Sequence, residues 1–120
     1  MQTASHWRTL LSLVLLIALQ AQAAVPPAAN GYKRLYVKAA YTYWGIDAPL
    51  SAQAGQIHQE SWWRCDAESP FAQGCAQFTP QTRDWIAKIY PDALGAPDSF
   101  SPSWSFKAQI LYMRRLYKQC

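Results

Sequence analysis

Glu60 is the residue whose position suggests chemistry most directly. It lies in Gln59-Glu60-Ser61, near the end of a segment whose apolar spacing predicts a helix. The negative end of a helix dipole disfavours a further negative charge, and a surrounding apolar core would withhold water from the carboxylate. Both effects favour the protonated acid, the form that a glycosidase uses to donate a proton to a leaving sugar. Glu60 is therefore a candidate general acid, and a solvated glutamate at a helix end is the alternative.

A polar run follows Glu60-Ser61 closely: Ser69-Pro70, then the sequence AQGCAQFTPQT over 72–82. This order resembles the lytic transglycosylase domain of the goose-type lysozyme superfamily. There, a Glu-Ser pair at a helix end precedes a Ser-Pro motif, glycines, a glutamine and often Pro-x-Thr. The resemblance extends over roughly 32–117 and is greatest to the phage- and prophage-associated branch. Two positions differ, since Phe71 occupies the place of a usual glycine and Cys75 that of a usual leucine.

The resemblance assigns a role to each matching position. Glu60 matches the catalytic acid, and Gln77 matches the glutamine that lines the cleft beside it. Gly74 matches the point where the backbone comes close to the catalytic helix, which a side chain would obstruct. Ser61 and Phe78 complete the expected substrate-binding residues taken from the motif.

The family's reaction cleaves the β-1,4 bond between N-acetylmuramic acid and N-acetylglucosamine in peptidoglycan. A single carboxylate acts first as acid and then as base, and the product is a 1,6-anhydro sugar, so no second acid and no cofactor is implied. If water attacked instead, the enzyme would be a muramidase. The acids nearest in sequence that could then serve as base are Asp66, Glu68 and Asp84.

Aromatic residues are numerous, with six tryptophans and seven tyrosines. Trp62 and Trp63 directly follow the acid and either stack on sugar rings or form a wall of the core; Trp62 is included among the substrate-binding candidates. His58, two residues before Glu60, points to another side of the helix, and we expect a structural role for it. Besides His6 it is the chain's only histidine, which makes zinc ligation improbable and predicts no metal site.

The N-terminal residues predict export. Residues 1–23 contain Arg8, the apolar run LLSLVLLIAL and the small residues of Ala21-Gln22-Ala23, which together form a signal peptide. The apolar run is shorter than the roughly 20 residues that a bilayer requires. We therefore expect a periplasmic or secreted protein without a stable membrane anchor, in contact with peptidoglycan glycan strands.

An exported chain with three cysteines predicts one disulfide and one free thiol. Cys65 and Cys75 bracket a proline-containing loop that can turn back on itself, which leaves Cys120 unpaired. The alternative is that Cys65 and Cys75 are buried thiols.

The elements that must position these residues are helices. After a flexible lead-in over 24–30, we expect one mainly α, lysozyme-like domain over 31–120, with no strand. The first helix runs from Gly31 to Gly45, and the second opens at Pro49 with Ser51 as N-cap and reaches Ser61. A short turn of helix is expected near 75–78, and 92–100 is expected to be a loop. Thr79-Pro80 and Ser101-Pro102 start two further helices. The expected inward residues of these two are Trp85, Ile86, Ile89, Trp104, Phe106, Ala108, Ile110, Leu111, Met113 and Tyr117.

The C-terminal part leaves a second class of function open. Family members continue into a further helical segment that supplies a tyrosine and an asparagine to the cleft, and we expect this domain to lack it. The alternative function is a catalytically inactive peptidoglycan-binding or assembly protein that acts with an envelope partner. The local cations Lys107, Arg114, Arg115 and Lys118 form either a solvated helix face or a surface for an anionic polymer or membrane; no nucleic acid partner is expected.

Overall fold

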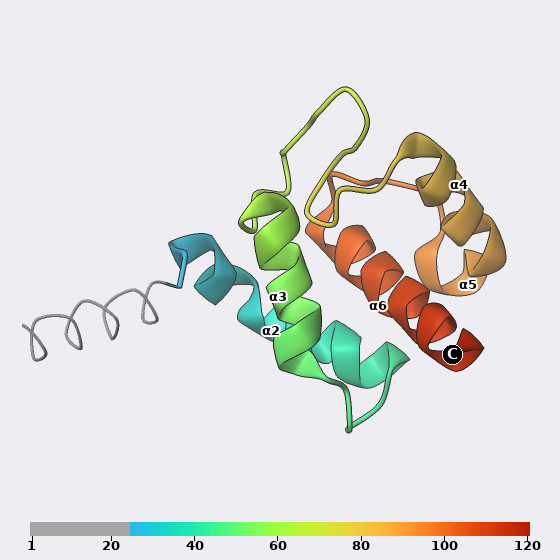
Figure 1. The fold of residues 1–120 in the computed structure, drawn as a ribbon, viewed down its shortest axis with the longest axis horizontal. Coiled ribbons are helices and arrows are strands. Elements are labelled where there is room, and N and C mark those ends of the chain that lie inside the picture. Colours follow the sequence, from blue (N-terminus) through green and yellow to red (C-terminus); the bar gives the residue numbers. More distant parts are fainter. Residues whose placement is uncertain (1–24) are drawn as a thin grey trace, which may run out of the picture.

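The computed structural model describes residues 25–120, which form five helices (Figure 1). These are α2 (Pro27–Tyr43), α3 (Leu50–Ser61), α4 (Pro80–Ile89), α5 (Pro91–Leu94) and α6 (Pro102–Gln119). This part of the chain contains no strand, only two isolated bridges, Glu68 to Gln73 and Gln73 to Phe78. The mainly α class is thus confirmed. The expected signal peptide, 1–23, lies outside the described residues.

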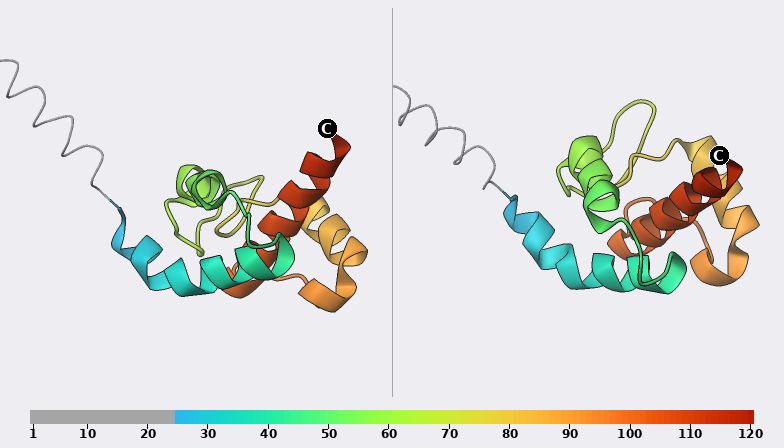
Figure 2. Two further views of the ribbon diagram at one scale, coloured as in Figure 1. Left: turned by 90° about the horizontal axis from the view of Figure 1, so that it is seen from below. Right: turned by 60° about the horizontal axis from the view of Figure 1, so that its bottom comes forward.

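Helix α6 is the centre of the arrangement. It lies between α3 on one side and α4 and α5 on the other, and α2 passes across α3 and α6 (Figures 1 and 2). Within residues 25–120, none of these helices is both long enough and apolar enough to cross a bilayer.

Two faces of α6 bury two clusters of side chains, as its spacing predicted. Phe106 and Ile110 point toward α2 and α3, where the Phe106 ring meets Tyr36 edge-on at a centroid distance of 5.0 Å. The other face packs against α4 and α5 and carries Trp104, Ala108 and Leu111. Each fully buried aliphatic or aromatic side chain contributes roughly 1.5–3 kcal/mol, so α6 carries much of the stability of the fold.

The last turns of α6 depart from the prediction. Met113 is half-buried, and Tyr117 is 71% exposed instead of buried. The Tyr117 ring lies on the surface against the Trp44 ring at the end of α2, at a centroid distance of 5.4 Å.

Trp85 is also more exposed than predicted, because Ile86 and Ala87 occupy the buried side of α4. The Trp85 ring instead lies on the surface, edge-on to Tyr112.

Local sequence motifs correctly predicted where two of the helices begin. The Thr79 side chain accepts a hydrogen bond from the Thr82 amide, and the Ser101 side chain accepts one from the Trp104 amide. Each cap is followed by a proline at the first helical position, where no amide hydrogen is needed.

Other boundaries differ from the prediction. Helix α2 begins at Pro27, so it includes part of the expected 24–30 lead-in, and Ala29 is buried in the core. Ser51 lies inside α3, because the helix already begins at Leu50 behind Pro49 and has no side-chain cap. Pro91 both ends α4 and opens the short helix α5, whose Leu94 is buried, within a region expected to be a loop.

Tyr36 links the core to stability at high pH. Burial raises the pKa of its phenol above the ordinary value near 10, and its hydrogen bond to Gln109 opposes part of that rise. The folded protein therefore holds this proton above pH 10 while the unfolded chain releases it. The contribution of protonated Tyr36 to the free energy of unfolding is therefore fully present below pH 10, and it is lost as the pH rises further.

We predict that the free energy of unfolding falls more steeply above pH 10 in the wild type than in Tyr36→Phe. The extra slope approaches about 1.4 kcal/mol per pH unit. Urea unfolding between pH 8 and 11.5 measures both slopes, and equal slopes would contradict the prediction.

Candidate functional site

Helix α3 presents Glu60 on an outer face. Its buried row consists of Gln53, Ile57 and Ser61, spaced four residues apart. Gln56 and Glu60 have the same spacing and form the neighbouring, exposed row. The predicted place of Glu60 in the last turn is confirmed, but the expectation that an apolar core withholds water from its carboxylate is wrong.

A cleft of about 210 Å³ opens beside Glu60. It lies where α3, the segment leading to α4, and α6 meet. Its lining residues are Gln56, Glu60, Ala76, Gln77, Phe78, Thr79, Thr82, Gln109 and Tyr112. Among them Glu60 alone carries a charge, and the other polar groups are amides and hydroxyls. A cleft of neutral hydrogen-bonding groups around one carboxylate suits an uncharged polar ligand such as a sugar.

Gln77 lines the same cleft as Glu60, and its side-chain amide is held in place by hydrogen bonds. Its backbone is left-handed (φ 51°), and its Nε2 donates hydrogen bonds to the carbonyls of Gly74 (2.8 Å) and Ala67 (3.2 Å). Both amide hydrogens are thereby used within the loop, and the Oε1 acceptor remains for a ligand. The predicted short helix over 75–78 is replaced by a series of turns, because Gly74 and Gln77 both have positive φ.

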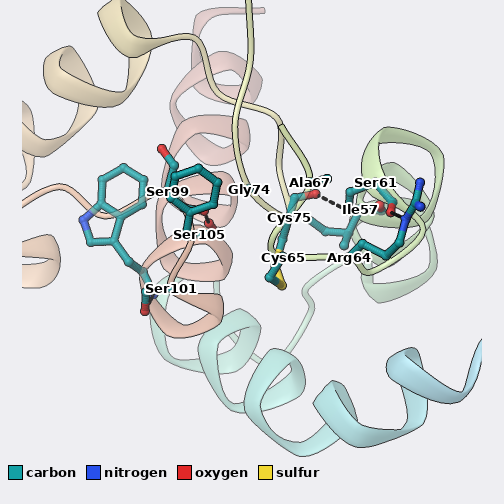
Figure 3. Close-up of a disulfide and its surroundings, with 12 residues drawn as sticks. Ile57, Ser61, Arg64, Cys65, Ala67, Gly74, Cys75, Ser99, Ser101 and Ser105 are labelled. Carbon is teal, nitrogen blue, oxygen red and sulfur yellow. Dashed lines mark hydrogen bonds between the residues drawn. A yellow bond between two sulfur atoms is a disulfide. The ribbon is translucent and has the colours of Figure 1, made fainter. Parts of the chain in front are cut away.

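Ser61 holds this loop against α3. Its hydroxyl donates to the Cys75 carbonyl at 2.7 Å, and the side chain is 3% exposed (Figure 3). The hydroxyl is therefore turned into the protein and not toward the cleft. Ser61 positions the loop that carries Gln77, and it is not among the residues that line the cleft, where the resemblance placed a substrate-binding group.

The predicted disulfide is confirmed. Cys65 and Cys75 are bonded and buried (Figure 3). Cys120 is free and exposed. The bridge closes the loop that begins four residues after Ser61.

Gly74 meets a close neighbour, but a different one from the expected helix. Its φ is +81°, and a Cβ atom there would collide with the carbonyl group of Ser99. The contact is thus with the segment before α6 and not with α3, because the disulfide loop folds back onto the start of α6. The Ser105 hydroxyl donates to that same Ser99 carbonyl (2.6 Å).

The aromatic candidates separate into core and surface residues. Phe78 lines the cleft but is buried, with its ring edge-on to Trp104 and Tyr112, so it forms the floor. Trp63 is 7% exposed and packs on Tyr36, whereas Trp62 is 59% exposed. The choice between the two tryptophans is settled: Trp63 belongs to the core, and Trp62 is free for contacts but lies outside the cleft lining.

The remaining candidates lie apart from the cleft. Asp66, Glu68 and Asp84 are exposed, and none of them lines it. Glu68 accepts a hydrogen bond from Gln73, and Asp84 pairs with Arg83 (2.8 Å).

His58 is half-buried and packs on the Trp62 ring (4.7 Å), in agreement with a structural role. Within residues 25–120, no three metal-binding side chains gather at one place.

A buried glutamine that sequence reasoning missed determines how the cleft presents its donors. The Nε2 of Gln109 donates to the Gln53 carbonyl and to the Gln56 Oε1, both at 2.9 Å. Its Oε1 accepts from the Tyr36 hydroxyl at 2.6 Å. Because the Gln53 carbonyl can only accept a hydrogen bond, the NH₂ end of the Gln109 amide must face it. Gln56 must then turn its oxygen to Gln109, and its NH₂ group is left for the cleft, one helical turn from Glu60.

Comparison of the chain with protein-family models, with curated proteins and with solved structures gives no match. The function must therefore be argued from the site itself.

We predict that Cys65→Ser/Cys75→Ser lowers the free energy of unfolding by about 2–3 kcal/mol, because the unfolded chain is no longer cross-linked. The reduced loop should also expose Gln77 to faster amide hydrogen exchange. Chemical unfolding monitored by tryptophan fluorescence gives the loss, and Cys120→Ser is the matched control that should leave stability unchanged. A double variant as stable as the control would contradict the prediction.

Proposed function

We propose that this protein is a peptidoglycan lytic transglycosylase with Glu60 as its catalytic residue. The observation that carries the proposal is the isolation of Glu60 as the single charged group in a cleft of neutral donors and acceptors. The ordered motifs from Glu60-Ser61 to Thr82 resemble the lytic transglycosylase domain, and this resemblance suggests that the bond cleaved is a glycosidic bond of peptidoglycan. The signal peptide proposed for 1–23 would bring the chain to peptidoglycan in the periplasm or outside the cell.

The proposed reaction needs one carboxyl group. Protonated Glu60 gives its proton to the glycosidic oxygen as the bond from that oxygen to C1 of N-acetylmuramic acid breaks. The carboxylate formed then takes the proton of the C6 hydroxyl of the same sugar, while the C6 oxygen bonds to C1. Glu60 is restored, no water is consumed, and the product is a 1,6-anhydro sugar.

The cleft supplies groups that suit the neutral parts of such a substrate. The Gln56 NH₂ and the Gln77 Oε1 offer one donor and one acceptor from residues that line the same cleft as Glu60. A bound sugar would displace water from the exposed carboxylate and so strengthen its interactions with the reacting oxygens.

One observation favours a second candidate function. Glu60 is exposed in the free protein, so the apolar surroundings expected around a catalytic acid are missing before a ligand binds. A catalytically inactive protein that binds peptidoglycan, or helps to assemble an envelope partner, would use the same cleft without needing an acid there.

We predict that the purified protein releases muropeptides ending in 1,6-anhydro-N-acetylmuramic acid from peptidoglycan, and that Glu60→Gln lowers the rate by a factor of at least about 10². Mass spectrometry of the released fragments identifies the ends. Glu68→Gln is the matched control, because Glu68 is an exposed acid outside the cleft. Reducing ends would indicate hydrolysis, and a folded wild type that binds strands without cleaving them would indicate the second function.

We predict that Gln56→Met lowers kcat/KM about tenfold, because it removes one donor to the substrate and also the Oε1 that accepts the hydrogen bond of Gln109. Gln56→Glu should lower kcat/KM further, since it places a second negative charge one turn from Glu60. Gln59→Met is the control on the same helix, away from the cleft. Steady-state kinetics with soluble glycan strands measures the change, and equal kcat/KM values for Gln56→Met and the wild type would refute the role of Gln56.

A further inference from the structure

A second pocket, of about 320 Å³, lies farther along α6 and is cationic. Its lining residues are Tyr90, Arg114, Arg115, Lys118 and Gln119. No acid is among them, and the one ion pair within residues 25–120 joins Arg83 to Asp84. Three positive charges thus converge without a carboxylate of the protein to neutralise them.

Arg115 is held in this pocket in a particular way. Its guanidinium centre lies 5.4 Å above the centre of the Trp85 ring, a cation–π contact that fixes the plane of the group. Its Nε is buried and has no hydrogen-bond partner among the described residues. The stacked guanidinium is thus not paired with a carboxylate among the described residues, and its charge is available to an acidic group of a ligand.

The cationic pocket lies farther along α6 than the proposed catalytic cleft, and contacts of the Trp85 ring connect the two. Tyr112 lines that cleft, and the Trp85 ring that contacts Arg115 also meets Tyr112 edge-on (6.2 Å). With a helical rise of 1.5 Å per residue, Arg115 lies about 4.5 Å and Lys118 about 9 Å beyond Tyr112 along α6. An extended peptide spans about 3.3–3.6 Å per residue, so three or four residues attached to a sugar in the cleft reach the pocket.

We propose that the pocket formed by Arg114, Arg115 and Lys118 is a subsite for the carboxylates of the peptide stem that peptidoglycan strands carry. The inference rests on the proposed function, since it assumes a glycan in the cleft beside Glu60. Guanidinium groups pair with carboxylates through two parallel hydrogen bonds, a geometry that a stacked, planar Arg115 favours. The protein then selects strands that bear peptides over strands from which the peptides have been removed.

The negative end of the α6 dipole also favours cations in its last turn. That contribution is the same with or without a ligand. It does not explain the stacking of Arg115 on α4, nor the unpaired Nε between the two helices.

The decisive experiment compares two substrates: glycan strands with peptide stems, and the same strands stripped of stems by an amidase. The test variant is Arg114→Gln/Arg115→Gln/Lys118→Gln. The matched control, Lys33→Gln/Arg34→Gln/Lys38→Gln, removes the same charge from exposed positions on α2. We expect the wild type and the control to prefer peptide-bearing strands about tenfold in kcat/KM. The test variant should lose this preference through a higher KM, with kcat on stripped strands unchanged.

A second measurement does not depend on catalysis. A free acidic stem tripeptide is titrated into the protein while the Arg115 Nε–H resonance is followed by NMR. We expect a saturable shift that weakens as salt increases and is retained in Glu60→Gln. Arg115→Lys, which keeps the charge without the planar fork, should bind the tripeptide several-fold more weakly.

The outcomes separate this inference from the proposed function. Equal cleavage of both strands by the wild type, or loss of the preference in the α2 control, overturns the peptide subsite and leaves the transglycosylase standing. If neither strand is cleaved, the proposed function fails, and the titration alone decides the subsite: the absence of a shift at Arg115 overturns it. Tighter binding of inorganic phosphate or of anionic vesicles than of the tripeptide also overturns it.

Discussion

The cleft depends on how Cys75 is attached to the end of α3. Its sulfur is bonded to Cys65, and its backbone carbonyl accepts the hydrogen bond of the buried Ser61 hydroxyl. The segment between α3 and α4 has no helix and no strand ladder to order it. These two attachments therefore replace regular structure, and they fix where Gln77 and the Phe78 floor lie relative to Glu60.

Helix α6 serves the core and the cleft at the same time. Phe106 and Ile110 fill the core between α2 and α3, while Gln109, adjacent in sequence, reaches the cleft. The buried amide of Gln109 joins Tyr36 on α2 to Gln56 on α3, so three helices share one hydrogen-bond network. Such a network specifies one arrangement of the helices, since any slip would leave polar groups unpaired in the interior.

The parts of the fold that the sequence predicted well are those set by near neighbours. The Thr79-Pro80 and Ser101-Pro102 starts, the end of α3 at Ser61 and the disulfide each depend on residues a few positions apart. The exposure of Glu60 was predicted wrongly because the apolar spacing of α3 does not say which of two adjoining rows meets the core.

The contacts that complete the site depend on residues far apart in sequence. Gln109 contacts Gln56 across 53 residues, and no local pattern marks that contact. The spacing of Gln56 and Glu60, four residues apart on one helix, was the one visible signal for the missed donor. Trp62 and Trp63 have the same local surroundings, so only the packing of the folded chain distinguishes them.

The turn after α3 has a consequence for motion near Glu60. Trp62 and Trp63 both have left-handed backbones (φ 55° and 63°), which costs of order 1–2 kcal/mol for each bulky residue. The burial of Trp63 against Tyr36 and Phe106 compensates for that strain. Most helix ends fray at little cost, but here opening the last turn would pull a tryptophan out of the core. Local unfolding of the turn that bears Glu60 is thereby coupled to global unfolding. The backbone that carries the Glu60 carboxylate is therefore held in place, although the ends of helices are usually mobile.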